Sequence, residues 1–578
     1  MNHSILIRGG VSLLTVISLS GCIDKNYDLS DIDTTSEIKV NNLILPINIA
    51  PITLSDIITI NQGDQIQEVK LNGQTVYAVR ESGEINSSDI VIEPFTSEAP
   101  TINPTVVEVH PEASQMPAGM VVKVPFDKVA QRLIYKAENL DDAIISISDL
   151  FLQNGKFEVI FSAEEPENVE MSLENLKFTL PKGMSLTSKS PSDLTYDAET
   201  GECIVPQLDL HENEAKVVIE IKSINLPAND SFVENHNLNL DTRLDIEGAD
   251  VVMRATANAQ LPDPITIDIK YELSDMVITA VSGEVEYNIE GIDIAPVYLS
   301  SLPDFFKGDE TNVILANPQI NLSLTNPLGN YGLDYKVGLS LTSVKGDEEK
   351  TYSPNDGTFT VGHSQDLDKR FAFCLSPKQT SYPVEGFEDA QYVPFTSLGM
   401  VLSGNGLPDE IKIDLPGTQI FRQTVDHFEL GTINGVKGDW EFLAPLALTK
   451  DGNQASRIIY TKTTQGWNDE DVDAIEITQL ELTAVADNNL PVDTELSGYP
   501  VDENGNQING AKFDTLVIPA GAKNHPVSLK LSGTVRHLDG ITYNAEIKGA
   551  EGEPLSPNQT LSLKNIKVKV SGNYTKEF

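Results

Sequence analysis

Apolar and polar side chains alternate along many short stretches of this chain. Val285, Tyr287 and Ile289 alternate with acidic and amide residues, and apolar residues occupy nearly every second position over 333–341. Successive side chains of a strand point to opposite faces of a sheet, so this period of two predicts strands with one buried and one solvated face. Sheets with one solvated face are antiparallel, because parallel sheets are covered on both faces. The alternation therefore predicts antiparallel sheets.

The spacing of the predicted strands sets the fold class. They are short, turn residues separate them, and few stretches show the 3.6-residue repeat of a helix. This arrangement predicts an all-β protein of several antiparallel β-sandwich domains in tandem, with an N-terminal β-rich region. One stretch differs from the rest. At 127–143 the spacing of Val129, Leu133, Ile134 and Ala137 is near the helical repeat and predicts a helix.

Two local features give sharper predictions. Asn72-Gly73 supplies the positive φ angles of a type I′ turn between two apolar runs, which predicts a hairpin. Farther along, the alternation loses its phase at Glu174-Asn175 and then resumes. A slip of one residue moves the apolar set to the other face of the sheet, so a bulge or a turn is expected there.

The first 22 residues have the pattern of a secretory signal. Arg8 precedes the apolar run 11–17, which is too short to span a bilayer, and Leu19-Ser20-Gly21-Cys22 follows. These four residues resemble the lipobox of bacterial lipoproteins, in which the peptidase cuts before the cysteine and the thiol carries the lipid. The resemblance implies that Cys22 is the lipidated first residue of the mature chain. Two or three acyl chains at one residue are enough for stable anchoring.

The residues after Cys22 are polar and acidic. The run 23–35 resembles the start of uncharacterised surface and outer-membrane lipoproteins of Bacteroidetes, and the stretches 316–329 and 535–541 look like recurring blocks of that group. The resemblance implies a lipid-anchored outer-membrane protein that is exposed at the cell surface, and it implies no particular chemistry.

Proline-containing stretches near 261–264 and 415–417 interrupt the strand pattern and suggest boundaries. The predicted divisions are a signal peptide at 1–21, an acidic tether at 22–45, an N-terminal β-rich region at 46–145, and sandwiches at 146–262, 263–416 and 417–578.

The net charge of the chain limits the classes of molecule that it is expected to bind. With 40 Lys and Arg against 86 Asp and Glu, the net charge is −46. Binding to nucleic acid requires clustered cations that neutralise phosphates, so no nucleic-acid partner is expected. After the N-terminal signal, no stretch reaches the roughly 18 apolar residues of a spanning helix. Membrane contact is therefore expected only through the lipid on Cys22.

Motifs for catalysis or metal binding are incomplete. His211-Glu212 begins like a zinc-protease helix but lacks the second histidine, and 362–366 resembles a nucleophile elbow whose last glycine is replaced by Asp366. The acidic loop 469–473 lacks the glycine and the final glutamate of an EF-hand, and the loop 502–506 has its glycine too early and is more simply a hairpin loop. Solvated turns are therefore the simpler interpretation and structural calcium is the alternative. We predict no catalytic residue, no metal site and no cofactor.

The remaining candidate residues are few. Trp467 follows a glycine and precedes an acidic loop, so it is the candidate for stacking on a sugar ring, whereas Trp440 is expected in a core. Thr34 follows an aspartate in the tether and resembles a Bacteroidetes O-glycosylation site. Cys203 and Cys374 are expected to be buried free thiols.

The function predicted from these features is that of a non-enzymatic cell-envelope lipoprotein with a structural or adhesive role, contacting a surface protein. The alternative is a glycan-binding accessory lipoprotein of a nutrient-uptake system. A hydrolase has the least support.

Overall fold

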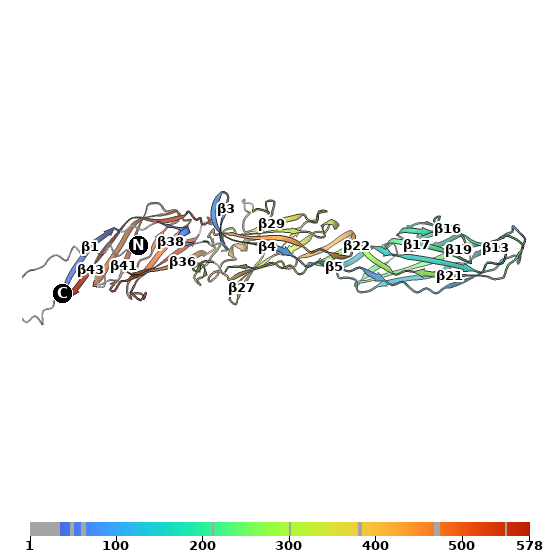
Figure 1. The fold of residues 1–578 in the computed structure, drawn as a ribbon, viewed down its shortest axis with the longest axis horizontal. Coiled ribbons are helices and arrows are strands. Elements are labelled where there is room, and N and C mark those ends of the chain that lie inside the picture. Colours follow the sequence, from blue (N-terminus) through green and yellow to red (C-terminus); the bar gives the residue numbers. More distant parts are fainter. Residues whose placement is uncertain are drawn as a thin grey trace, which may run out of the picture.

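The computed structural model describes residues 35–46, 51–58, 60, 65–210, 213–229, 231–299, 302–379, 384–466, 474–549 and 552–577. Nearly every element is a strand, and nearly every strand pair is antiparallel, which confirms the predicted all-β fold with several units. The molecule is elongated (Figure 1). We distinguish three parts along its long axis: a terminal section that contains both described ends of the chain, a middle section and a distal section. Among the described helices, none is long and apolar enough to cross a membrane.

The terminal section has two sheets that face each other across a small core, in which Ala486 and Ile518 are fully buried. The first sheet contains the N-terminal strands and the C-terminal strand, and a helical turn follows the second of them: β1 (Thr35–Pro46), β2 (Ile52–Thr53), α2 (Leu54–Ile57), β37 (Ile475–Asn488), β39 (Lys512–Phe513), β41 (His525–Ser532) and β43 (Thr560–Glu577). The second sheet contains β35 (Lys450–Asp451), β36 (Gln454–Thr464), β38 (Val492–Val501), β40 (Leu516–Ile518) and β42 (Gly540–Gly549).

The middle section is built around a six-stranded sheet: β3 (Ile66–Leu71), β4 (Gln74–Asn86), β24 (Gln319–Thr325), β29 (Arg370–Ser376), β30 (Gln391–Pro394) and β34 (Lys437–Pro445). Smaller sheets and short helices complete it: β5 (Ile90–Ile92), β23 (Val297–Tyr298), α3 (Asp304–Lys307), η3 (Gly329–Tyr331), β26 (Ser340–Lys345), β27 (Glu348–Tyr352), η4 (Thr396–Met400), β31 (Glu410–Asp414) and β33 (Gly431–Ile433). Only β29 and β30 among the described pairs run parallel.

The distal section consists of two facing sheets and a two-stranded ribbon. One sheet contains β9 (Val121–Phe126), β10 (Val129–Ala137), β13 (Val169–Thr179), β15 (Thr195–Tyr196), β16 (Glu202–Asp209), β18 (Phe232–Glu234) and β19 (Asn237–Ala255). The other contains β6 (Phe95–Ser97), β7 (Thr105–Val109), β11 (Ile144–Asn154), β12 (Lys156–Ala163), β14 (Met184–Ser190), β17 (Glu214–Asn225), β21 (Ile265–Leu273) and β22 (Met276–Asn288), and it continues into the middle section through β25 (Tyr335–Gly338), β28 (Thr358–Val361) and β32 (Gln419–Glu429). The ribbon pairs β8 (Gln115–Met116) with β20 (Ala259–Gln260), and η2 (Pro227–Asn229) lies before β18.

The sections are nested in the sequence rather than consecutive. The first described strand pairs with the last, Thr35 opposite Glu577, so the chain runs out to the distal section and returns. The sheets also cross the predicted boundaries, because β22 pairs with β11 on one side and β32 on the other. The ranges 46–145, 146–262, 263–416 and 417–578 therefore do not each form a section of their own.

One hydrophobic cluster extends through the distal and middle sections and reaches some residues of the terminal section, whose own core residues form separate clusters. A single cluster of contacting buried residues includes Leu54 and Leu490 in the terminal section, Leu322 in the middle section and Leu173 in the distal section. Sections joined by a flexible linker would have separate cores. The cluster indicates that the distal and middle sections share one core and that the terminal section packs against the middle section.

Strands also join the sections directly. The long β22 lies between β11 and β32 at the boundary of the distal and middle sections (Figure 1). At the other boundary, Asn312 and Arg457 exchange backbone hydrogen bonds of 2.8 and 2.7 Å, and the buried Ser456 hydroxyl donates to the Ile314 carbonyl at 2.8 Å. Both boundaries are thus bonded through the backbone, not merely touching.

The helix predicted at 127–143 is wrong. Val129–Ala137 forms β10, which pairs with β19 from Val129 opposite Ile246 to Ala137 opposite Leu238. Leu133, Tyr135 and Ala137 are buried at every second position, and the helical spacing arose by including Ile134, which is only half-buried. Pairing with a strand about 100 residues away outweighed the local pattern.

Other local predictions are confirmed. Asn72 and Gly73 have φ of 49° and 81° and join β3 to β4 as a hairpin. The register of β13 against β19 shifts between Glu174 and Lys177, which is the expected bulge. Cys203 and Cys374 are buried free thiols.

Candidate functional site

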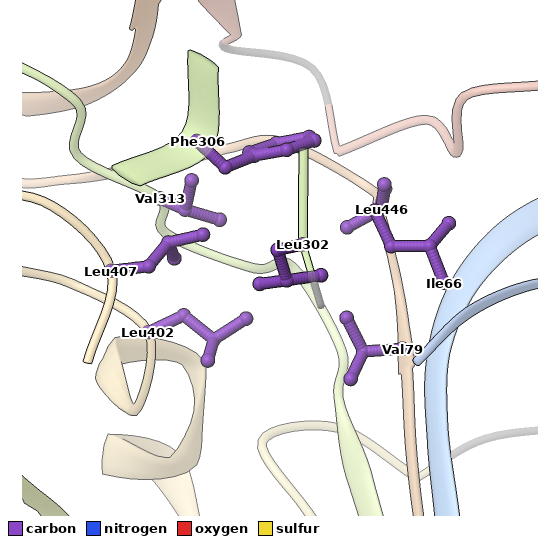
Figure 2. Close-up of a pocket in the computed structure, with 8 residues that line it drawn as sticks. All are labelled: Ile66, Val79, Leu302, Phe306, Val313, Leu402, Leu407 and Leu446. Carbon is purple, nitrogen blue, oxygen red and sulfur yellow. The ribbon is translucent and has the colours of Figure 1, made fainter. Parts of the chain in front are cut away.

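One cavity lies inside the middle section, and it is apolar. Figure 2 shows the side chains around it, contributed by β3, β4, α3 and nearby segments: Ile66, Val79, Leu302, Phe306, Val313, Leu402, Leu407 and Leu446. Its volume is about 10 Å³, whereas ligand pockets typically measure about 300–1,000 Å³. With no polar atom in its lining, this cavity is a small packing gap and not a binding site.

A second hollow lies on the outer surface of the distal section and has a volume of about 290 Å³. Strands β9, β13 and β19 line it, with Asn175 and Lys177 on one side and Glu247 and Asp250 on the other. It is open and polar. We call these lining residues, together with Pro125, Phe126, Gly248 and Ala249, the distal hollow.

Two backbone irregularities that face each other form the distal hollow. Asn175 in the bulge of β13 has a φ of 54°, and Gly248 across the ladder has a φ of 144°. Residues other than glycine rarely adopt a φ like that of Gly248. The two irregularities break the regular pleat at one place, and β-bulges often redirect side chains in this way at sites of function.

Ion pairs fix the charged groups around the distal hollow. Lys128 Nζ lies 2.6 Å from Glu247 Oε1 and 3.4 Å from Asp245 Oδ2. The hydrogen bond to Glu247, more than any other contact, raises the pKa of Lys128 above its ordinary value. Asn175 Nδ2 donates to Asp250 Oδ2 at 3.3 Å. Asp245 Oδ1 is buried and has no hydrogen-bond partner among the described residues.

The groups in the distal hollow are suited to binding a polar ligand. It presents an ammonium group, carboxylates and an amide within one concavity, which suits a ligand with several hydroxyl groups. Its lining contains no histidine, cysteine or serine that would act as a nucleophile or proton shuttle. No group of three or more His, Cys, Asp or Glu side chains placed to hold a metal ion occurs in the described part of the chain.

The sequence signalled half of this site. The phase slip at Glu174-Asn175 located the bulge, but the opposing Gly248 went unnoticed within a long strand pattern. An isolated glycine inside a strand often marks a bulge, so Gly248 was the available signal. That the two irregularities face each other depends on the register of β13 against β19, which a local pattern does not contain.

The predicted site residues Cys22, Thr34 and Trp467 lie outside the residues that the structure describes, as does the acidic loop 469–473. Trp440 is 2% exposed in the middle section, which confirms its expected place in a core. Its indole ring lies over Gly83 on the neighbouring strand, where an added Cβ would approach within 2.8 Å of the indole nitrogen. Trp440 is thus not available to a ligand.

Two of the incomplete motifs form ordinary loops, and His211-Glu212 lies outside the residues that the structure describes. His363 Nδ1 is hydrogen-bonded to Asp334 Oδ1 at 2.7 Å, and the Ser364 hydroxyl accepts the Asp366 amide. No hydrogen bond found within the described ranges joins Ser364 to a histidine. Asp502 accepts the amides of Asn504 and Asn506, each at 2.9 Å, so its carboxylate closes the hairpin loop that the sequence predicted as the simpler interpretation.

Comparisons with known proteins give little further guidance. No protein-family model matches the chain, and no curated protein matches it. A solved structure from Parabacteroides distasonis, described as a "putative secreted protein", is 15% identical, with a TM-score of 0.35, and the match covers 50% of this chain and 88% of that one. At this TM-score the similarity carries no argument about fold or function.

Proposed function

We propose that this protein is a non-enzymatic lipoprotein of the cell envelope, anchored to the outer membrane through Cys22, that acts as a stiff spacer and holds its distal section away from the membrane at the cell surface. The observation that carries the proposal is the nested topology. Because β1 pairs with β43, the chain leaves the anchor side and returns to it, and the distal section lies at the opposite end of the molecule (Figure 1).

Stiffness is the second support. The core cluster is continuous from Leu54 to Leu555, and strands or backbone bridges cross both section boundaries. Spacing two objects apart requires resistance to bending, which fused cores supply and flexible linkers do not. The net charge of −46 keeps such a body soluble and repelled from an anionic surface.

Replacing Cys22 by Ala tests the anchor. The variant has no thiol for lipid attachment, so we expect it to move from the membrane fraction to the soluble fraction, whereas Cys203→Ala should leave the distribution unchanged. The measurement is fractionation of cells followed by immunodetection. If the Cys22→Ala variant remains in the membrane fraction, the protein is not anchored through a lipid on Cys22.

A second function, glycan binding for nutrient uptake, is favoured by one observation, the distal hollow. Its volume of about 290 Å³ lies near the lower limit of known ligand pockets, and its polar lining matches the hydroxyl groups of a sugar. The predicted stacking residue Trp467 is a separate candidate for the same function.

A glycan-array screen of the full chain, produced without lipid, tests this second function. If the distal hollow binds sugar, saturable binding should fall at least about tenfold in Asp250→Ala, the loss expected for a charged hydrogen bond, and should persist in the distant control Asp502→Ala. If binding is lost in Trp467→Ala and not in Asp250→Ala, the glycan site lies at Trp467 and not in the distal hollow. The absence of binding to every glycan would exclude the glycan-binding function.

A further inference from the structure

The N-terminal strands pair with the two ends of the C-terminal strand, β1 with its last part and β2 with its first residues. Thr35 is opposite Glu577, Pro46 is opposite Lys567, and Ile52 is opposite Leu561. Pro46 and Ile52 are six residues apart, and so are their partners, so the register is kept from β1 to β2. Strands β1 and β2 thus pair with successive parts of β43, with one register shift inside β1 between Val40 and Leu43.

This path leads from the outer end of the terminal section to the middle section. The C-terminus, beside Thr35, lies at one extremity of the molecule (Figure 1). Just before β43 begins, the Leu555 carbonyl accepts the Tyr77 amide at 2.9 Å, and the Ser556 hydroxyl donates to the Thr75 carbonyl at 2.8 Å, both in β4 of the middle section. Strand β1 therefore runs inward from this extremity toward the middle section, obliquely to the long axis (Figure 1).

The direction of a pull decides how the β1–β43 ladder is loaded. The hydrogen bonds of an antiparallel ladder are perpendicular to the strands. A pull on Thr35 that is directed outward, while the inner end of β43 is held through the middle section, has a component along the strands that loads these bonds together. The backbone of a strand is already near its maximum length per residue, so β1 cannot yield by stretching. A pull that separates Thr35 from the adjacent Glu577 instead opens the ladder one pair at a time.

We propose that β1 and β2, paired along β43, form a load-bearing clamp that resists tension between the N-terminal tether and the distal section by holding the ladder in shear. The inference rests on the proposed function only for the place where the load enters the chain. A surface protein whose distal section is held by a partner would experience tension along this axis, and the clamp would keep the terminal section folded under it.

Single-molecule force spectroscopy on the full chain, produced without lipid, tests the clamp. One handle is attached to the thiol of Cys22. The other is attached to a cysteine introduced at Glu112, which is exposed in a distal loop, or to one added at the C-terminus. We expect the first rupture under axial pulling, between Cys22 and the distal loop, to need at least about twice the force of end-to-end pulling at the same loading rate, because forced unfolding follows the barrier along the pulled direction. Equal or lower axial force would overturn the proposal.

A proline pair supplies the matched variant. Alternate residues of an antiparallel strand bond to a given partner, so Lys39→Pro with Val40→Pro removes at least one bond to β43 whichever residue makes it. The axial rupture force should fall in this variant. It should stay unchanged in the control, Glu348→Pro with Glu349→Pro, which alters the exposed edge strand β27 outside the load path. An axial force that the first pair leaves unchanged would also contradict the clamp. Neither readout depends on lipidation, so failure here is separate from failure of the Cys22 test.

Discussion

At the scale of single residues, one buried carboxylate stands out in the middle section. Glu441 on β34 is 5% exposed, and Arg80 on β4 reaches it with Nη2 at 2.9 Å from Oε2. The other oxygen, Oε1, is buried and has no hydrogen-bond partner among the described residues. The guanidinium is thus the group that compensates the buried charge.

Removing the Arg80 guanidinium should lower the free energy of unfolding. Arg80→Met keeps most of the side-chain volume but leaves the carboxylate uncompensated. Breaking a fully buried pair in this way costs about 3–5 kcal/mol, and because the Arg80 side chain is 41% exposed, we expect a smaller loss here. We expect a lower midpoint of urea unfolding, followed by circular dichroism. Adding Glu441→Gln to Arg80→Met should restore much of the loss because it removes the charge. A midpoint that Arg80→Met leaves unchanged would show that water compensates Glu441 instead.

The sequence predicted some residue environments and not this one. Trp440 was placed in a core because Phe442 shares its strand face, which is local information, and the structure confirms it. The pairing of Arg80 with Glu441 joins residues 361 positions apart. No local pattern indicates that an exposed-looking glutamate has a partner at that distance.

At the scale of elements, strands β36 and β42 hold an ionic network near the boundary of the terminal and middle sections. Arg457 Nε donates to Glu546 Oε1 at 2.7 Å, and Lys548 Nζ lies 3.3 Å from the same oxygen. Burial alone would raise the pKa of Glu546, but the hydrogen bonds and positive charges of Arg457 and Lys548 outweigh it and hold that pKa below its ordinary value.

This network predicts a pH dependence of stability. Because the pKa of Glu546 is depressed in the folded state, its contribution is present above the ordinary glutamate pKa of about 4.3 and is lost as the pH falls through the folded value. Glu546→Gln should therefore lower the unfolding midpoint at about pH 7 and lower it progressively less toward about pH 3. A difference from the unsubstituted protein that is constant across this range would contradict the assignment.

The positions of strands could be predicted from the sequence more readily than which strands pair with each other. Local patterns indicated individual strands, the Asn72-Gly73 turn and the β13 bulge, because each is recorded within a few neighbouring residues. The pairing of β1 with β43 joins the two ends of the chain, and the distal hollow needs the register of β13 against β19. Such choices depend on packing over hundreds of residues, so linear domain ranges were expected where the structure has nested sections.

At the scale of the whole molecule, the three sections form one elongated body (Figure 1). One core cluster reaches all three sections, the chain enters and leaves at the same end, and the distal hollow lies in the section farthest from that end. An anchor at Cys22 would then place the terminal section at the membrane and the distal section away from it. Each part of the proposed function depends on the sections not bending independently.

Small-angle X-ray scattering of the full chain, produced without lipid, tests this stiffness most directly. A fused rod predicts a pair-distance distribution with a peak at the cross-section and a long, smoothly falling tail, and a scattering curve that a single copy of the structure fits. Sections that move on flexible joints would instead require a mixture of bent forms to fit the curve and would shorten the maximum dimension. That second result would contradict the account of a stiff spacer.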